Sequence, residues 1–302
     1  MPTRLTSAIC TPLHPDGTLH GEGLRAHIEA QLTAGIDGIL VAGTMGLMQL
    51  QTDATYARLI EESFASVARR CELWVGVGDA SFARTLTRIR VAERHAVDGL
   101  VVLTPYFLNF TEAELIRYFL ELAEASTKPL FLYDLPTLTG TALSMELLER
   151  VIEHPNIHGL KCTRTWEWTT ELYQRLGNRT RVIPAQPERV ADLVRLNVPD
   201  NLDGLFAIFP NQSRALADAA DRGDWPEADR IQADISAFLV TAREKSLFGA
   251  VTVVMNALEI PGEMAPAPIS QLSDADAQEL LAQPLIQRLI ENEIKLSVTA
   301  EA

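Results

Sequence analysis

Residues 129–133 read PLFLY and residues 157–161 read IHGLK, and these two short apolar runs decide the fold. A stretch of helical periodicity separates them. Continuous apolar runs of this length are typical of strands that are buried on both faces, whereas half-exposed strands alternate polar and apolar residues. The two runs therefore predict strands of a parallel sheet with a helix between them.

The same alternation extends along the chain in both directions. Six further runs have the character of buried strands, and they lie at residues 5–10, 38–42, 73–77, 98–103, 181–185 and 204–208. The clearest helical stretches cover residues 21–35, 53–70, 81–95 and 111–125. Eight strand–helix units over about 220 residues predict an α/β fold of the (β/α)8 class, a TIM barrel. A doubly wound open sheet is the alternative, but its dinucleotide fingerprint is missing, because residues 76–79 read only GVGD.

Beyond residue 210 the pattern changes. Residues 213–246 and 272–297 predict helices only, and the segment 260–269 that joins them holds three prolines and a glycine. No shift in composition marks an independent domain. We therefore expect a barrel over residues 1–212 and a C-terminal helical extension, packed on the barrel, over residues 213–302.

The composition excludes several classes of partner. The 302 residues include 26 Lys and Arg against 40 Asp and Glu, a formal net charge of −14 that repels a nucleic-acid backbone. No run approaches the roughly 18 apolar residues of a membrane helix, so no membrane partner is expected. Three scattered cysteines and dispersed histidines fit free thiols in a reducing cytoplasm, without a disulfide framework or a metal site.

One lysine stands out at a predicted strand end, where barrel enzymes place their active sites. The chain has four lysines, and only Lys161 closes an apolar run. An ammonium group is costly in an apolar site unless it loses its proton. The neutral amine is a nucleophile that forms a Schiff base with a carbonyl substrate. Taken alone, the lysine is explained equally well by a side chain that reaches solvent or pairs with a carboxylate.

Two further features follow predicted strands. Tyr133 ends the run before that of Lys161, and a phenol at this place can pass protons to an imine carbon or a substrate hydroxyl. The turn Gly43-Thr44-Met45-Gly46 follows the second run, and its backbone N–H groups can point at a carboxylate. Each feature also has a plain explanation, a tyrosine packed at a barrel rim and a tight turn that needs glycine.

Together, these motifs resemble the dihydrodipicolinate synthase/N-acetylneuraminate lyase family. The resemblance extends from Ala8 to Leu272 and keeps the family's order of motifs. It rests on Gly43-Thr44-Met45-Gly46, Thr104-Pro105-Tyr106, Tyr133-Asp134-Leu135-Pro136 and Gly159-Leu160-Lys161. It implies a (β/α)8 barrel with a C-terminal helical region, assembled as a homo-oligomer, usually a tetramer.

The resemblance also implies a role for each candidate residue. Lys161 forms an imine with the keto carbon of pyruvate or a larger 2-oxo acid, Tyr133 shuttles protons, and Thr44 holds the phenol. The amides of residues 43–45 bind the substrate carboxylate. The chemistry requires no metal and no organic cofactor. The implied substrate-binding positions are Gly43, Met45, Tyr106, Leu138 and Ala207.

The chain departs from the family pattern around this core. The family commonly has a second threonine where Met45 stands and a glutamate where Leu47 stands. The synthases usually have a second tyrosine at the position of Phe107 and an arginine, which holds a substrate carboxylate, at the position of Leu138. Ala207 replaces a glycine or serine. These changes predict a site that keeps the imine-forming residues but is more apolar around them.

We therefore expect a class I, Schiff-base lyase or aldolase that acts on a 2-oxo acid, with an aldehyde as a candidate second substrate. We expect that it is not a working dihydrodipicolinate synthase. A 2-keto-3-deoxy sugar acid dehydratase that uses the same imine, and a barrel that binds a 2-oxo acid with little turnover, are the alternatives. Arg164, three residues after Lys161, is a candidate replacement for the cationic group missing at Leu138.

Overall fold

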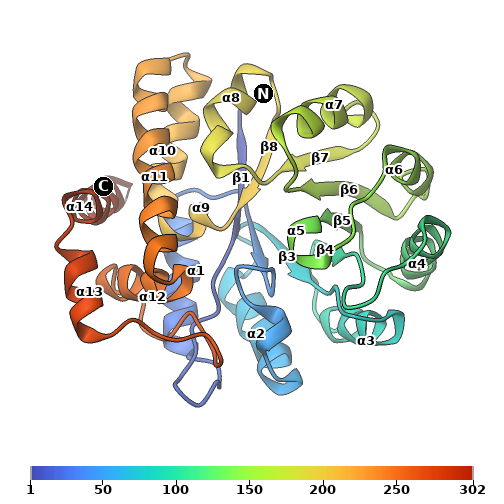
Figure 1. Cartoon of the computed structure of the whole chain (residues 1–302), viewed down its shortest axis with the longest axis horizontal. Helices are drawn as coiled ribbons and strands as arrows, with labels where there is room; N and C mark the ends of the chain where they lie inside the picture. Colours follow the sequence, from blue (N-terminus) through green and yellow to red (C-terminus); the bar gives the residue numbers. More distant parts are fainter. Residues whose placement is uncertain (1, 301–302) are drawn as a thin grey trace. The chain divides into compact units, whose positions relative to one another are not determined.

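The computed structural model describes residues 2–300, drawn in Figure 1. Its eight strands are β1 (Arg4–Ala8), β2 (Gly38–Val41), β3 (Glu72–Gly76), β4 (Gly99–Leu103), β5 (Leu130–Asp134), β6 (Ile157–Cys162), β7 (Arg181–Pro184) and β8 (Asp200–Asp203). They follow the sheet order β7-β6-β5-β4-β3-β2-β1-β8. The fold is the predicted (β/α)8 barrel with C-terminal helices.

Helices follow the strands in turn. Those between the strands are α1 (Gly21–Thr33), α2 (Asp53–Val67), α3 (Phe82–Ala92), α4 (Glu112–Ala125), α5 (Pro136–Thr139), α6 (Met145–Val151), α7 (Trp166–Leu176) and α8 (Val190–Arg195), with single 3₁₀ turns at Met48–Leu50 and Pro187–Arg189. Those after the last strand are α9 (Leu205–Ile208), α10 (Pro210–Asp221), α11 (Trp225–Lys245), α12 (Leu247–Ala257), α13 (Asp274–Leu281) and α14 (Pro284–Ala300). Among residues 2–300 no helix combines the length and the hydrophobicity needed to cross a membrane.

Short polar residues set the starts of the helices. The hydroxyl groups of Thr52, Ser144 and Thr165 each accept a hydrogen bond from a backbone N–H in the first turn of the helix that follows. Thr111 forms a complete capping box with Glu114. Because such caps satisfy N–H groups that the helix itself leaves unpaired, they fix where each loop after a strand must end.

The chain divides into two compact units. Unit 1 comprises Met1–Cys71 and Gln186–Ala302, and unit 2 comprises Glu72–Ala185. In unit 1, β1 pairs in parallel with β2 on one side and β8 on the other. The C-terminal helices belong to this unit, and α10 and α11 pack side by side (Figure 1). Their core is apolar and includes Phe209 and Phe238, whose rings meet edge to face at 5.1 Å.

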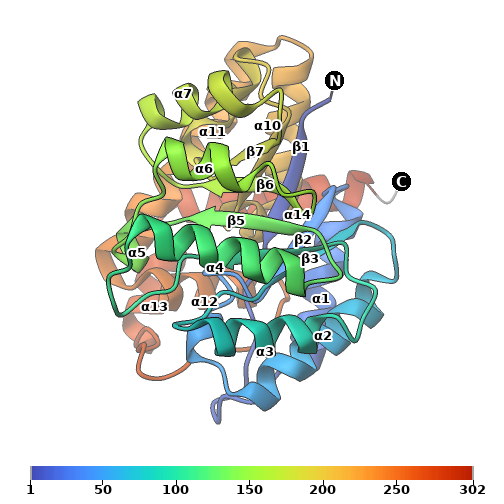
Figure 2. The ribbon, with the colours of Figure 1, turned by 90° about the vertical axis from the view of Figure 1, so that its right-hand side faces the viewer.

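In unit 2, β3 to β7 pair in parallel and in sequence order. Figure 2 shows α4 running beside both α3 and α6, which it contacts. The ring of Phe131 stacks on Trp74 at 4.2 Å. A side chain on Gly99 or Gly159 would come within 2.9 Å of this ring. The two glycines therefore make room for Phe131 on the strands that flank β5.

The prediction for the last strand is wrong. Residues 204–208, predicted as a strand, form a short helical turn that includes α9, and the strand is β8, which comprises Asp200, Asn201, Leu202 and Asp203. Every residue of α9 is buried, and periodicity alone cannot separate a short buried helix from a buried strand. The strand itself is polar and escapes an apolar-run criterion. Its residues have particular polar partners instead, because Asp200 pairs with Arg4 at 3.4 Å and Asp203 accepts a hydrogen bond from the Leu205 N–H.

The C-terminal extension is helical as expected, but the pattern did not give the number of helices. Residues 213–246 lie in two helices, α10 and α11, that turn at Gly223, where φ is +75°. The pattern missed α12 altogether. This helix is so apolar on most sides that it lacks the polar stripe by which an amphipathic helix is recognised.

Candidate active site

The structure places Tyr133 and Lys161 opposite each other on neighbouring strands. They are paired in the register of β5 and β6, so both side chains emerge on the same face of the sheet. The Lys161 Nζ lies 3.8 Å from the centre of the Tyr133 ring. Both residues are buried, with 5% and 4% of their surface exposed. The pair combines a primary amine and a phenol at the C-terminal ends of adjacent strands.

The surroundings of Lys161 exclude the two plain explanations of a lysine at this place. Its burial shows that the amine does not extend into solvent. Within residues 2–300 it forms no ion pair with a carboxylate. A buried amine without a counter-ion is expensive to keep for stability alone, which points to a chemical use.

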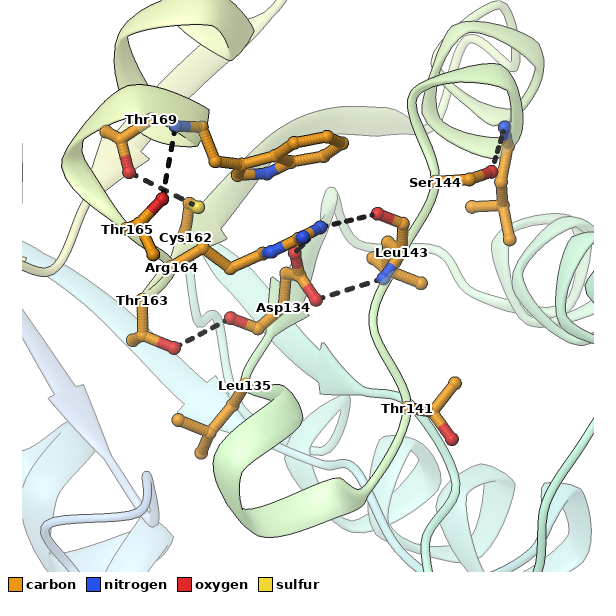
Figure 3. A network of polar contacts seen from close by, with 12 residues as sticks. Asp134, Leu135, Thr141, Leu143, Ser144, Cys162, Thr163, Arg164, Thr165 and Thr169 are labelled. Carbon is orange, nitrogen blue, oxygen red and sulfur yellow. Dashed lines mark hydrogen bonds and ion pairs between the residues drawn. The ribbon is translucent and has the colours of Figure 1, made fainter.

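A polar network surrounds Asp134 (Figure 3), whose side chain points to the face of β5 opposite that of Tyr133. Asp134 follows Tyr133 and is fully buried. Its Oδ1 accepts a hydrogen bond of 3.1 Å from the Leu143 N–H, and its Oδ2 lies 3.8 Å from Arg164 Nη1. Burial raises the pKa of Asp134 to about 6, while the Leu143 N–H and the Arg164 charge lower it in part.

Arg164 is engaged within this network. Its Nη1 donates a hydrogen bond of 3.2 Å to the Leu143 carbonyl, and its guanidinium carbon lies 3.8 Å from the centre of the Trp168 ring. Side chains alternate between the two faces of a strand, so Asp134 points away from the face that carries Tyr133. The structure thus gives no support to the expectation that Arg164 supplies a cation to the substrate.

Tyr106 lies in the loop after β4, close to a second charged cluster. It is half-buried, and burial together with the neighbouring Asp79 carboxylate raises its pKa. Asp79 in turn accepts hydrogen bonds of 2.8 Å from the Nε atoms of Arg84 and Arg88. Sequence reasoning named Tyr106 but missed this cluster, whose residues come from the loop after β3 and from α3.

Three large apolar side chains of unit 2 are exposed. The exposed fractions are 93% for Phe107, 63% for Leu108 and 67% for Leu138. Phe107 also has a left-handed backbone conformation, with φ at +83°, which is unusual for a bulky residue. Leu138 lies on α5, in the loop that follows Tyr133. In the isolated chain, neither Phe107 nor Leu138 is packed into a core.

In unit 1, the turn at residues 43–46 is held firmly. The Gly46 carbonyl accepts hydrogen bonds from Thr11 Oγ1 and Gln51 Nε2, at 2.9 and 2.6 Å. A Cβ atom on Gly46 would approach Thr11 Oγ1 to 3.0 Å, so the close contact favours glycine. The hydroxyl of Thr44 is buried and has no hydrogen-bond partner among the residues that the structure describes. It is therefore a buried polar group whose hydrogen bond the described part of unit 1 does not supply.

Met45 has a specific neighbour in the same unit. A Cβ atom on Gly204 would lie 2.8 Å from the Met45 Cγ and 2.9 Å from its Sδ. Since β2 and β8 flank β1, the Met45 side chain reaches across the C-terminal end of β1. Ala207 lies in α9 and not at a strand end, and its carbonyl accepts a hydrogen bond of 3.0 Å from Gln31 Nε2. Gly204, which sequence reasoning missed, is the residue at this edge whose lack of a side chain makes room for Met45.

The two buried cysteine thiols have the surroundings of structural residues rather than of catalytic ones. Cys162 is fully buried, and burial raises its pKa to about 11. Cys10 is buried as well, with its pKa raised to about 12. Among residues 2–300 no three His, Cys, Asp or Glu side chains gather closely enough to hold a metal ion. Neither thiol is poised to act as a nucleophile.

The structure is a (β/α)8 barrel with an amine and a phenol at the ends of adjacent strands. Comparison of the sequence with family profiles makes this specific, because the profile of the Dihydrodipicolinate synthetase family matches residues 1–286. The chain belongs to that family, whose members are lyases and aldolases.

Curated relatives share a modest part of the sequence. The 4-hydroxy-tetrahydrodipicolinate synthase 1 of Streptomyces coelicolor is 29% identical over 282 residues, which is 92% of either chain. The 4-hydroxy-tetrahydrodipicolinate synthase of Acidothermus cellulolyticus is 33% identical over 228 residues, 73% of this chain and 71% of the relative.

Solved structures share the fold. YagE, a prophage protein of the dihydrodipicolinic acid synthase family from E. coli K12, was solved in complex with pyruvate. It aligns with a TM-score of 0.87 at 24% identity, over 95% of this chain and 98% of its own. CdNal of Clostridium difficile, solved in complex with mannosamine, aligns with a TM-score of 0.86 at 16% identity, over 97% and 99%.

Proposed function

We propose that the protein is a class I lyase or aldolase that acts on a 2-oxo acid through a Schiff base on Lys161. The observation that carries the proposal is the buried amine of Lys161, 3.8 Å from the centre of the Tyr133 ring and without a carboxylate partner within residues 2–300. A family relative of known structure, YagE, binds pyruvate. Pyruvate, or a substrate that releases it, is thus the first ligand to test.

The proposed reaction begins with attack of the Lys161 amine on the keto carbon. The carbinolamine loses water to give a protonated imine, which accepts electrons as an enamine. In aldol cleavage the β-hydroxyl gives its proton to Tyr133, the bond between the α- and β-carbons breaks, and an aldehyde leaves; condensation is the reverse. In dehydration the α-proton is removed and the β-hydroxyl, protonated by Tyr133, leaves as water. Hydrolysis of the imine then frees Lys161. The Thr44 hydroxyl, which is buried and lacks a partner among the described residues, is free to hold a phenol or a substrate oxygen. Aldol cleavage and sugar acid dehydration share the enamine, so the proposal covers both.

We further propose that the reaction is not that of 4-hydroxy-tetrahydrodipicolinate synthase, the name carried by the curated relatives. That reaction brings a second carboxylate into the site, which costs several kcal/mol without a cationic partner. Leu138 offers no cation, and Arg164 is engaged with Asp134 and Trp168. A less polar second substrate fits the apolar side chains better.

Borohydride reduction in the presence of pyruvate tests the proposal. The expected result is an intact-mass increase of one reduced pyruvyl group, mapped to Lys161 by peptide sequencing. Lys161→Ala should abolish the adduct, and Lys128→Ala, a matched change at another of the four lysines, should retain it. Absence of an adduct with every 2-oxo acid tried, or an adduct on another lysine, would overturn the assignment.

A panel of aldehydes then separates catalysis from binding. An enzyme should show turnover with at least one of them, measured as pyruvate consumption or release. A coupled assay with pyruvate and aspartate semialdehyde tests the negative part of the proposal. Turnover within about tenfold of an ordinary synthase, less than the loss of one acid/base group causes, would contradict it.

We also propose that the protein works as a homo-oligomer in the cytoplasm. Phe107 and Leu108 expose 93% and 63% of their surface, and adjacent apolar side chains of this size commonly mark a contact surface. The free thiols fit a reducing compartment. Light scattering on the purified protein should give a mass of a dimer or tetramer, and a monomer would contradict this part of the proposal.

A further inference from the structure

The loop between β5 and α6 (residues 135–142, the β5–α6 loop) begins and ends at the same polar network. Asp134 precedes the loop and Leu143 follows it, and the Asp134 carboxylate accepts a hydrogen bond from the Leu143 N–H. Arg164 donates to the Leu143 carbonyl and lies 3.8 Å from Asp134 Oδ2. Both backbone polar groups of Leu143 are thus held by side chains, and the loop is closed at its base (Figure 3).

The same residues connect the loop to the strand that carries the candidate nucleophile. The Asp134 carbonyl accepts hydrogen bonds from the N–H and the hydroxyl of Thr163, at 3.2 and 2.8 Å. Thr163 follows β6 directly, two residues after Lys161. The base of the loop is therefore fastened to the ends of both strands of the Tyr133–Lys161 pair.

Within the loop, α5 is a rigid turn. The Thr139 hydroxyl donates to the carbonyls of Leu135 and Thr141, each at 3.1 Å. Gly140 ends the turn with φ at +72°. Because the interior of the loop is internally bonded, its position is set mainly at the base. Leu138 lies on this turn, so the base also sets where Leu138 stands.

We propose that Asp134 and Arg164 are positioning residues, which clamp the β5–α6 loop and thereby set how the site discriminates among 2-oxo acids by the size of the group beyond the keto carbon. This inference rests on the proposed function for its substrate class. The clamp itself is a property of the chain and can be measured without substrate.

The charge of Asp134 gives the clamp a particular pH dependence. Arg164 and the Cys162 thiol are the titratable or charged groups that face this carboxyl. We call the loop closed when Asp134 is bonded to Leu143 as in the structure, and open when this bond is broken and the carboxyl is hydrated. The pKa of Asp134 is raised to about 6 in the closed form, and in the open form it returns toward its ordinary value of 3.8. The closed form therefore binds the proton more tightly. Closure should be about tenfold more favourable at pH 5 than at pH 8, with the advantage lost as the pH rises through 6.

Hydrogen exchange of the amides in residues 135–143, measured without ligand, tests the clamp. Asp134→Ala removes the acceptor of the Leu143 N–H, and should speed exchange in this segment about tenfold relative to α4. Asp134→Asn keeps an acceptor, so hydrogen exchange in this segment should stay slow, and its pH dependence should disappear. Arg164→Met leaves a buried carboxylate without its cation and should speed exchange at pH 8. The double variant Asp134→Asn/Arg164→Met should regain protection, because both charges are gone.

The functional arm compares borohydride trapping of pyruvate with trapping of 2-oxohexanoate. Asp134→Ala should change the ratio of the two rates about tenfold, with the rate for pyruvate within about a factor of two of the parent. Glu293→Ala, a change at a buried carboxylate of unit 1, is the control and should leave the ratio unchanged.

Two outcomes would overturn the inference. One is exchange in residues 135–143 that Asp134→Ala leaves unchanged or accelerates only as much as in α4. The other is a loss of protection from exchange in Arg164→Met that the added change Asp134→Asn does not reverse. If no 2-oxo acid is trapped at all, the proposed function fails, but the exchange data still decide whether the clamp exists.

Discussion

Two buried carboxylates, one in each unit, differ in how completely they are bonded. Glu293 on α14 accepts four hydrogen bonds at 2.7–3.1 Å, from the backbone and side-chain N–H groups of Asn211 and Gln212. It thereby fastens α14 to the first turn of α10. Asp134 accepts one hydrogen bond, and its Oδ2 accepts none from the described residues.

Glu293 is therefore a charge that stabilises the fold, whereas Asp134 is a charge that can still gain interactions. A fully bonded buried carboxylate has no partner left to gain, so changing it can only weaken the fold. A partly bonded carboxylate can still gain a partner, so a proton, a ligand or a neighbouring cation can lower its free energy. Incomplete bonding of this kind is expected where function constrains a structure. The following changes test that contrast, from the largest expected effect to the smallest.

Glu293→Ala should have the largest effect, on stability. It leaves four N–H donors, two buried and two partly buried, without an acceptor, and the free energy of unfolding should fall by about 4 kcal/mol. Urea unfolding followed by circular dichroism measures this. Glu291→Ala, an exposed residue two positions earlier on the same helix, should stay within about 0.5 kcal/mol of the parent. Equal losses in the two variants would remove the special status of Glu293.

Tyr133→Phe should act mainly on turnover, whereas Glu293→Ala acts on stability. Turnover should fall by about 10²-fold or more, the loss expected for a positioned acid/base, while pyruvate trapping at Lys161 continues more slowly. Tyr118→Phe is the matched control. It removes a buried hydroxyl that pairs with Thr85 at 2.9 Å, so it should cost about 1 kcal/mol of stability and keep turnover. Turnover that survives in Tyr133→Phe would exclude this phenol from the mechanism.

His27 should make unit 1 sensitive to acid. It is fully buried on α1, its Nε2 accepts a hydrogen bond from the Cys10 N–H, and burial lowers its pKa to about 3. The unfolded chain takes up the proton near pH 6.5 and the folded chain does not, so stability is complete above pH 6.5 and declines as the pH falls toward 3. Between pH 6.5 and 4.5 the free energy of unfolding should fall by about 2 kcal/mol through this group. Denaturant titrations across this range should show a shallower slope for His27→Gln, and equal slopes would contradict the assignment.

Thr44→Val should have the smallest effect on stability and a clear one on activity. The Thr44 hydroxyl is buried without a partner among the described residues, so removing it should change the free energy of unfolding by less than about 1 kcal/mol, in either direction. Turnover should nevertheless fall about tenfold or more. Ser63→Ala removes a similarly buried, unpartnered hydroxyl on α2 and should leave turnover intact. Equal turnover losses in both variants would indicate a general packing effect.

The fold was predictable where burial leaves a regular mark on the sequence. The runs that became β5 and β6 are apolar because both faces of each strand are covered, and Lys161 stood out as the one charged group at the end of such a run. The same criterion failed at β8, which is polar: Asp200 pairs with the distant Arg4, and Asp203 accepts a hydrogen bond from the Leu205 N–H.

Single residues of the candidate site were predictable, but the contacts that surround them were not. The motifs named Tyr133 and Lys161, and the register of β5 and β6 brings them together. The clamp at Asp134 and Arg164 escaped, because its third member, Leu143, takes part through its backbone and carries no sequence signal. The alternation of faces along β5 was the available clue, since it turns Asp134 away from Tyr133 and toward the helical layer.

The contact between Met45 and Gly204 has a consequence for how this protein evolves. Any side chain at position 204 would displace Met45 from its present place over β1. Selection for a new substrate can therefore act at residue 204, which needs no contact with the substrate, and the order in which mutations arise matters. Alanine at position 204 requires either that the flexible methionine shifts or that a smaller residue stands at position 45, so the order that begins at position 45 avoids the displacement. Lineages that keep a methionine at position 45 should thus retain glycine at position 204, and the two positions should change together.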